Sequence, residues 1–371
     1  MSFCQTTPRI IAPKKVLEKF QHVTINGGIE FDDPCRVARI AWAYREVVRR
    51  SIKYLFEGKS VEELVKALYN ILPNYIYLET ALKQARTIVE GLLEKEVETG
   101  RVIHAEIKRM WFANRGNKFD GGNRNIRIHV RENHVVVKIR DPWGGWLEGR
   151  AFFGERYIPL LKELEELAGR REESYGVVIS FREHPRIHVQ IPLHLYLKHF
   201  STPKPPGYGL VAGFDLNSDR INVIVIDRSG NIVSLKTLWF SEATRPGFPR
   251  EKAGYLRLNA LGQAIKYVAR IGADYVAFEN LYEVKRKRFT ENPTANRKIS
   301  KFAKRQLLLH GILRSLREGL HVVLVDPRGT TNSKEHDEVM KRHGLDRHTA
   351  SAYLVALRAL SKVDINQHKH T

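Results

Sequence analysis

Residues 211–238 hold three short apolar segments in close succession, at 211–216, 221–227 and 231–238, and the tight turn "DRSGN" leads into the third. Short apolar runs bounded by turn residues predict β-strands, and strands this close predict a meander. Further elements are expected as a helix over about 251–271, a strand at 274–279, a helix over about 296–318, a strand at 321–326 and a helix from about 346 to 361. A meander followed by alternating helices and strands predicts a mixed sheet with helices on its faces.

This order of elements is that of ribonuclease H-like (RuvC-like) folds, so we expect an α/β domain of that class over 206–371. The preceding segment "STPKPPGYG" (201–209) has three prolines and two glycines and is the expected linker. The linker separates this domain from residues 1–205, which we expect to form an independent region.

The region 1–205 shows two kinds of pattern. Apolar residues recur at helical spacing over 36–57, 61–72 and about 77–98, which predicts helices. Period-two alternation over 125–141 and 175–195 predicts two β-hairpins. We therefore expect an α+β region made of a helical bundle and a small β-barrel.

The amino-acid composition indicates which kinds of partner this protein could bind. The chain has 62 Lys and Arg against 41 Asp and Glu, a net charge of +21 that both halves share. This surplus favours nucleic acid as a partner, and the alternative is the charged surface of a soluble basic protein. Cys4 and Cys35 are too few for a disulfide framework or a cysteine zinc site. Without a long apolar run or a secretory leader, we expect a cytoplasmic protein with no membrane partner.

Three acids stand at informative places among the expected elements. Asp215 follows the first strand's apolar run, Glu279 ends the fourth strand in "YVAFENL", and Asp346 begins the last helix in "LDRHTASAYLVALRAL". In a ribonuclease H-like sheet the first and fourth strands are neighbours, and the last helix starts across their ends. We therefore expect the three carboxylates to meet.

Carboxylates that meet repel each other unless a cation neutralises them. Two Mg²⁺ or Mn²⁺ ions would do so, and two-metal sites cleave phosphodiester bonds. Each acid also has a structural interpretation, since Asp215 could cap a turn, Glu279 could pair with a nearby lysine, and Asp346 could cap its helix. Only the joint placement favours catalysis.

The segments "GFDLNSDRINVIVID", "AFENLYEVKRK" and "VDPRGTTNSKEH…LDRHTASAYLVALRAL" resemble the TnpB (OrfB) proteins encoded by transposons, which are relatives of type V CRISPR effectors. The family pattern has an aspartate after the first strand, a glutamate in "E-[DN]-L" and an aspartate in "D-R-[DH]". Asp215, Glu279 and Asp346 stand at these positions, and the match covers most of 206–361. The resemblance implies an RNA-guided DNA endonuclease with a guide RNA and a double-stranded DNA target.

The resemblance also directs attention to a basic segment over 284–306. Its lysines and arginines fit a groove that follows phosphates, although a solvated helix face is the alternative. The nine residues are Lys285, Arg286, Lys287, Arg288, Arg297, Lys298, Lys301, Lys304 and Arg305. Arg347, beside Asp346, is a tenth candidate for contact with nucleic acid.

The chain departs from the family pattern in two places. The family's four-cysteine zinc ribbon is replaced by 328–345, which has no cysteine, so we expect no structural zinc and a short helix-like linker. His336 and His343 lack zinc-ligand spacing and are interpreted as surface residues. His348 stands where "D-R-D" has an acid.

Two further segments each have two possible interpretations. The "TTNS" segment (330–333) could bind a nucleic-acid backbone or cap a helix. Trp143 and Trp146 could stack on bases or pack within the β-region. Two other functions stay open for the whole chain, an RNA-guided DNA-binding protein that does not cleave and a guide-free nuclease acting on branched DNA.

Overall fold

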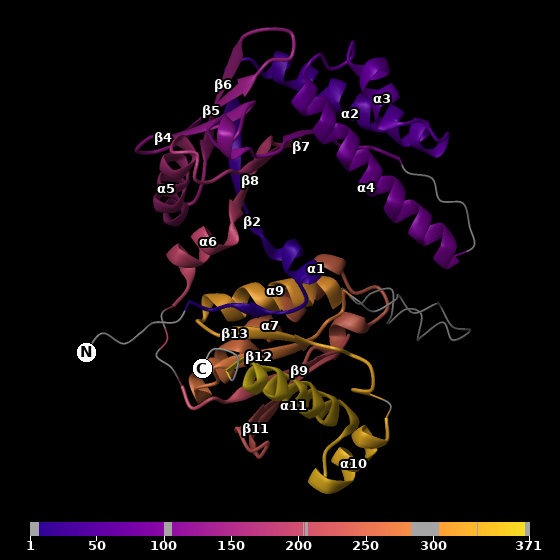
Figure 1. Cartoon of the computed structure of the whole chain (residues 1–371), viewed down its shortest axis with the longest axis vertical. Coiled ribbons are helices and arrows are strands. Elements are labelled where there is room, and N and C mark those ends of the chain that lie inside the picture. Colours follow the sequence, from indigo (N-terminus) through magenta and orange to yellow (C-terminus); the bar gives the residue numbers. More distant parts are fainter. Residues whose placement is uncertain are drawn as a thin grey trace. The chain divides into compact units, whose positions relative to one another are not determined.

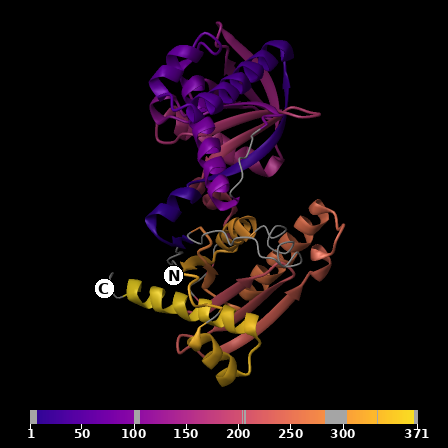
Figure 2. The ribbon, with the colours of Figure 1, turned by 90° about the vertical axis from the view of Figure 1, so that its right-hand side faces the viewer.

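The computed structural model of the chain describes residues 7–99, 106–202, 204, 207–282, 304–331 and 333–367. The chain divides into two compact units (Figures 1 and 2). We call Phe20–His199 the N-terminal unit, and Phe200–Thr371 together with Met1–Lys19 the C-terminal unit. The C-terminal unit thus begins at Phe200 and also includes the first nineteen residues.

The C-terminal unit contains the elements expected after the linker, except that residues 296–303 of one expected helix lie outside the described ranges. Its strands are β1 (Ile10–Ile11), β9 (Val211–Leu216), β10 (Arg220–Ile226), β11 (Ile232–Trp239), β12 (Tyr275–Glu279) and β13 (His321–Val325). Its helices are α1 (Lys14–Leu17), α7 (Arg250–Ile271), α9 (Lys304–Arg317), α10 (Lys334–His343) and α11 (Arg347–Gln367). The short α10 occupies the interval where a helix-like linker was expected.

The sheet of this unit has the strand order β1-β13-β12-β9-β10-β11. Strands β9, β10 and β11 form an antiparallel meander, whereas β12 is parallel to both β9 and β13. The expected mixed sheet is confirmed, and its order is compatible with the ribonuclease H-like fold. The sequence did not predict β1, which adds a parallel edge strand beside β13.

Helices cover both faces of this sheet (Figure 1). Phe214 and Phe278 lie on one face, with ring centroids 4.9 Å apart, and Gly311 of α9 approaches the Phe278 ring there. Helix α11 covers the other face, over a buried cluster that includes Val211 and Ala277. Alternate side chains of a strand point to opposite faces, which places Asp215 and Glu279 on the α11 side.

Gly213 allows α11 to approach β9 closely. A Cβ atom at Gly213 would lie 2.1 Å from the backbone oxygen of Ala352 and 2.7 Å from the backbone nitrogen of Ala356. Contacts this short leave no room for a side chain at residue 213 unless α11 moves away. Because Asp215 follows two residues later on the same strand face, this packing fixes the start of α11 relative to that carboxylate.

The N-terminal unit combines one sheet with several helices. Its strands are β2 (His22–Phe31), β3 (Met110–Asn114), β4 (Ile126–Val130), β5 (Val135–Arg140), β6 (Trp146–Phe152), β7 (Gly176–Phe181) and β8 (Arg186–Pro192). Its helices are α2 (Pro34–Phe56), α3 (Val61–Leu68), α4 (Tyr75–Thr99), α5 (Ile158–Gly169) and α6 (Leu193–Phe200), whose last residue belongs to the C-terminal unit. The three expected helices and both expected hairpins are present.

The expected small β-barrel is corrected by the pairing of these strands. All the pairs are antiparallel, and the order is β3-β7-β8-β2-β6-β5-β4. Within the described ranges β3 and β4 do not pair, so the sheet is open and has two edges. Closure of a barrel depends on the meeting of distant strands, which local alternation does not specify.

Among the described residues, no helix has both the length and the hydropathy needed to span a bilayer.

Candidate functional site

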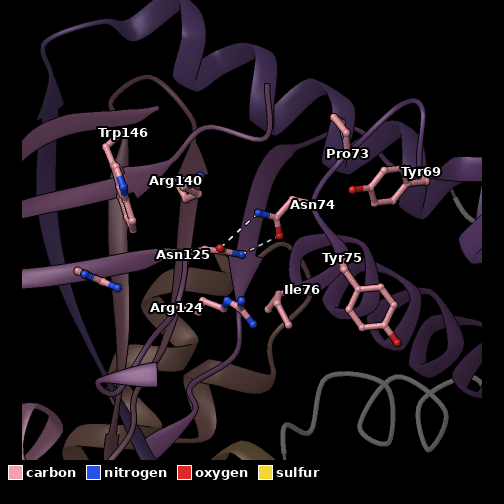
Figure 3. A pocket seen from close by; sticks show the side chains of 10 residues that line it. Tyr69, Pro73, Asn74, Tyr75, Ile76, Arg124, Asn125, Arg140 and Trp146 are labelled. Carbon is pink, nitrogen blue, oxygen red and sulfur yellow. Dashed lines mark hydrogen bonds between the residues drawn. The ribbon is translucent and has the colours of Figure 1, made fainter. Parts of the chain in front are cut away.

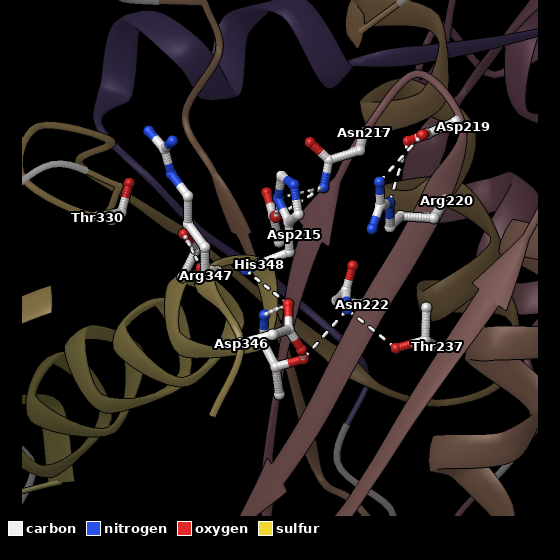
Figure 4. Close-up of polar contacts among 12 residues, drawn as sticks. Asp215, Asn217, Asp219, Arg220, Asn222, Thr237, Thr330, Asp346, Arg347 and His348 are labelled. Atoms are coloured by element: carbon white, nitrogen blue, oxygen red, sulfur yellow. Dashed lines mark hydrogen bonds and ion pairs between the residues drawn. The ribbon is translucent and has the colours of Figure 1, made fainter. Parts of the chain in front are cut away.

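Four polar side chains form a row across the sheet of the C-terminal unit, and Figure 4 labels three of them, Asp215, Asn222 and Thr237. Asp215 on β9 lies opposite Asn222 on β10, and Asn222 lies opposite Thr237 on β11. Glu279 ends β12 one residue beyond the last paired position of β12 and β9, and Asp215 has the same place on β9. Side chains at one level of adjacent strands point to the same face. We call Glu279, Asp215, Asn222 and Thr237 the polar row.

Asp346 caps the helix that covers the polar row. Its Oδ1 accepts hydrogen bonds from the backbone nitrogens of His348 (2.9 Å) and Thr349 (3.3 Å), and its Oδ2 accepts one from the Thr349 hydroxyl (2.5 Å). Burial by itself raises the pKa of Asp346, but these hydrogen bonds outweigh it and lower the pKa below its usual value. Asp346 therefore stays ionised at neutral pH and is held by its own helix.

His348 joins the start of α11 to β9. Its Nδ1 lies 3.0 Å from Oδ2 of Asp215, and the side-chain nitrogen of Asn217 donates to the same oxygen at 2.7 Å. The Asp215 side chain is largely buried, with 12% of its surface exposed. A buried carboxylate needs a hydrogen-bond donor or a cation, and here a histidine and an amide supply the donors. Asp215 and Asp346 are thus bridged through one residue.

Glu279 is held by the loop that follows β13. The Thr330 hydroxyl lies 2.5 Å from Oε1 of Glu279 and 2.8 Å from the carbonyl oxygen of Pro327. Thr330 is fully buried, so its side chain is fixed by packing as well. The "TTNS" segment therefore has a local role, in which Thr330 orients the acid at the end of β12.

Asn222 contributes an oxygen with unused hydrogen-bonding capacity. Its side-chain nitrogen donates to the hydroxyls of Thr237 (2.9 Å) and Thr349 (3.1 Å). Only 2% of Asn222 is exposed, and its Oδ1 is buried without a hydrogen-bond partner among the described residues. An unpaired buried oxygen costs free energy, which makes this atom a candidate ligand for a cation.

These donors do not form a preassembled metal centre. Within the described part of the chain, no three His, Cys, Asp or Glu side chains lie close enough to hold a metal ion together. The donor set nevertheless fits Mg²⁺ or Mn²⁺ in kind, because carboxylate and amide oxygens are the hard ligands those ions prefer. The unpartnered oxygen of Asn222, opposite Asp215, is the structural observation that supports this fit.

The basic residues expected to contact nucleic acid lie mostly outside the described ranges. This applies to Lys285, Arg286, Lys287, Arg288, Arg297, Lys298 and Lys301. Lys304 and Arg305 begin α9, where only the backbone is described. Arg347 begins α11 beside Asp346 and has an exposed surface.

The two histidines of the 328–345 interval are not simple surface residues. His336 is 1% exposed, and its Nε2 lies 2.9 Å from the backbone oxygen of Arg347 and 3.3 Å from the Ser351 hydroxyl. His343 is half-buried and packs against the Tyr353 ring. The prediction was wrong because both residues lie on α10, which packs against α11. His336 thereby supports the start of the helix that carries Asp346.

Sequence reasoning missed Asn222, His348 and Thr349 as parts of this site. Asn222 could have been noticed in the sequence, since it is a polar residue on the face of β10 that also carries the apolar Ile224 and Ile226. The observation becomes meaningful only with the strand register, which sets Asn222 opposite Asp215. His348 and Thr349 acquire their roles from the docking of α11.

The C-terminal unit is therefore an α/β domain with a mixed sheet compatible with the ribonuclease H-like fold, and Asp215 and Glu279 lie at the carboxyl ends of β9 and β12. The chain belongs to the SSO2105 family. It is 58% identical over 365 residues to the uncharacterized protein SSO2105 of Saccharolobus solfataricus, and the match covers 98% of this chain and 99% of that protein. The family model for the SSO2105 N-terminal domain matches residues 22–201.

More distant relatives extend this family. Two uncharacterized proteins of Aeropyrum pernix are each 30% identical over 324 residues, which is 80% of this chain and 82% or 73% of theirs. Among solved structures, Thermus thermophilus RuvC in complex with a Holliday junction substrate has a TM-score of 0.31 at 15% identity, over 42% of this chain and 96% of that one. A Cas12i–crRNA–dsDNA complex has a TM-score of 0.31 at 9% identity, over 91% of this chain and 62% of that one. The fold assignment rests on the strand order, not on these two likenesses.

Proposed function

We propose that the C-terminal unit is a divalent-metal-dependent nuclease site of the RuvC-like class, with Asp215, Glu279 and Asp346 as its acids. The observation that carries the proposal is the arrangement of these carboxylates. Asp215 and Glu279 stand at one level of two adjacent parallel strands, and His348 bridges Asp215 to Asp346. Acids that are distant in sequence but lie at the ends of adjacent strands are candidates for catalysis, although these three do not form a preassembled cluster.

The chain's own residues would divide the work of phosphodiester hydrolysis. Asp215, Glu279 and the side-chain oxygen of Asn222 would hold Mg²⁺ or Mn²⁺, and Thr330 would keep Glu279 oriented. Asp346 would complete the ligand set after its helix-capping hydrogen bonds rearrange. Divalent cations in such sites supply Lewis-acid stabilisation of the charge that develops on the scissile phosphate.

The finer proposal is a TnpB-like, RNA-guided DNA endonuclease. Its support is the match of the three acidic segments in the 206–361 region to the family pattern, together with the net charge of +21. In guided systems base pairing reads the sequence, while the protein holds the backbone and needs a broad positive surface. A guide RNA and a double-stranded DNA target are therefore the proposed partners.

Two measurements test the proposal. RNA that copurifies with the full chain is sequenced first, and DNA complementary to it is then incubated with the protein in Mg²⁺ or Mn²⁺. We expect cleavage by the natural chain and none by Asp215→Asn, with RNA binding intact in both. Asp227→Asn is the matched control. Asp227 comes directly after the last residue of β10, at the end of the strand away from Asn222, and its carboxylate stabilises a turn. Cleavage that survives Asp215→Asn would show that the site lies elsewhere.

A second candidate function is guided DNA binding without cleavage. The contacts of His348 favour it, since this side chain occupies the buried oxygen of Asp215 and Asp346 already serves as a helix cap. The same experiment separates the two functions. A protein that shifts its complementary DNA in a gel but yields no product in either metal is a binder, whereas cut DNA in either metal identifies a nuclease.

A further inference from the structure

A cavity of the N-terminal unit gathers arginines and aromatic side chains. It has a volume of about 430 Å³ and lies between strands β4–β6 and the start of α4 (Figure 3). Three arginines line it, Arg124, Arg127 and Arg140, together with Trp146, Tyr75 and Tyr69. None of the described residues that line it is acidic. Its volume is within the range of sites that hold small molecules, about 300–1,000 Å³.

Trp146 provides a flat platform at one side of this cavity. It is the first residue of β6 and faces outward, because its neighbour Leu147 is buried in the core. The indole remains 37% exposed. The guanidinium carbons of Arg127 and Arg140 lie 5.1 and 5.4 Å from its ring centroid. The two guanidinium groups lie over the indole ring at distances longer than close stacking, so a base that stacks on Trp146 would displace one of them from the ring.

The arginines of the cavity carry uncompensated charge. Among the described residues, Arg124, Arg127 and Arg140 form no ion pair with a carboxylate. The nearest acids along the strands are already paired, Glu148 with Lys138 at 3.1 Å and Asp141 with Arg36. The first residues of α4 also line the cavity, and the amino end of a helix attracts anions. The cavity therefore favours an anionic occupant.

The floor of the cavity is fixed before any ligand arrives. Asn74 and Asn125 exchange side-chain hydrogen bonds of 3.3 and 2.9 Å (Figure 3), and Asn125 donates a further one to Asn114 at 3.0 Å. Asn125 and Asn114 are buried. This amide network ties the loop before α4 to the start of β4, so the two walls of the cavity keep their spacing. A preorganised site loses less entropy when it binds.

We propose that this cavity binds one nucleotide of an unpaired nucleic-acid strand, with the base stacked on Trp146 and the phosphate held by the arginines. Arginine and aromatic side chains together match a phosphate and a planar ring, and stacking tolerates any base. A base within a duplex is already stacked on its neighbours and cannot lie on the indole. The inference rests on the N-terminal unit alone, so it stands whether or not the C-terminal unit cleaves DNA.

The test measures fluorescence anisotropy of a labelled single-stranded RNA, the matching single-stranded DNA and the DNA duplex. The full chain is used at elevated salt, where nonspecific phosphate binding is weak. We expect Trp146→Ala to weaken binding of the single strands at least about fivefold, because the stacking of one base on an aromatic ring contributes at least that much to the affinity. Duplex binding should change by less than about twofold, and Trp146→Phe should retain most of the affinity. The RNA and DNA arms show which strand the cavity prefers.

A charge-matched pair of variants completes the test. The double variant Arg127→Ala/Arg140→Ala should weaken single-strand binding and reduce the salt dependence of log Kd by about one to two units. The control Lys162→Ala/Arg170→Ala removes the same charge from two exposed positions, Lys162 on α5 and Arg170 at its C-cap, and should have little effect. Wild-type affinity in Trp146→Ala, or an equal loss in both double variants, would overturn the proposal.

Discussion

The close approach of α11 to β9 predicts a large effect for the smallest possible substitution, Gly213→Ala. The added Cβ would lie 2.1 Å from the backbone oxygen of Ala352, and ordinary contact begins at 3.4 Å. Helix α11 would have to move by about 1.3 Å, because backbone atoms cannot rotate away as a side chain can. Overpacking of a core costs about 1–3 kcal/mol, and a clash with backbone belongs at the upper end, about 3 kcal/mol.

A matched glycine in the same unit should give the opposite sign. Gly254 lies within α7, and a Cβ atom there would meet nothing within 4 Å. Gly254→Ala should therefore stabilise the protein by about 0.5–1 kcal/mol, since alanine loses less backbone entropy in a helix. The same chemical change thus tests packing against propensity.

Urea denaturation and hydrogen–deuterium exchange of α11 peptides measure both effects. We expect faster exchange in α11 for Gly213→Ala, together with a lower free energy of unfolding. We expect unchanged or slower exchange for Gly254→Ala. The reasoning is refuted if Gly213→Ala is as stable as the natural chain and its α11 amides remain equally protected.

Two further predictions concern the start of α11. Thr349→Val removes the hydroxyl that donates to Asp346 and accepts from Asn222, and should cost about 1 kcal/mol at neutral pH. The lowered pKa of Asp346 gives stability that is present above its unfolded pKa of about 3.9 and lost as the pH falls through the folded value. The difference between variant and natural chain in urea denaturation should therefore shrink below about pH 4, and a constant difference would contradict this role. His348→Ala removes one of the two partners of Oδ2 of Asp215 and leaves the Asn217 amide, so Mn²⁺ binding in calorimetry should tighten several-fold. Unchanged Mn²⁺ affinity in His348→Ala would show that the histidine does not compete with the cation.

The element order of the C-terminal unit could be predicted from the sequence. The apolar segments around Val211 and Ile224 have the length and turn boundaries of strands, and the last helix follows from apolar residues at helical spacing. Such patterns depend on neighbours within a few residues, which is why they can be read locally. The same holds for the two hairpins of the N-terminal unit, and for the placement of Asp215 and Glu279 at strand ends.

The tertiary structure alone decided how these elements meet. The register that sets Asn222 opposite Asp215, the bridge through His348, the burial of His336 and the addition of β1 to the sheet all join residues more than five positions apart in sequence. The open sheet of the N-terminal unit has the same origin. Each is settled by the packing of whole surfaces, such as α11 against Gly213, and no local pattern carries the energy of contacts between distant segments.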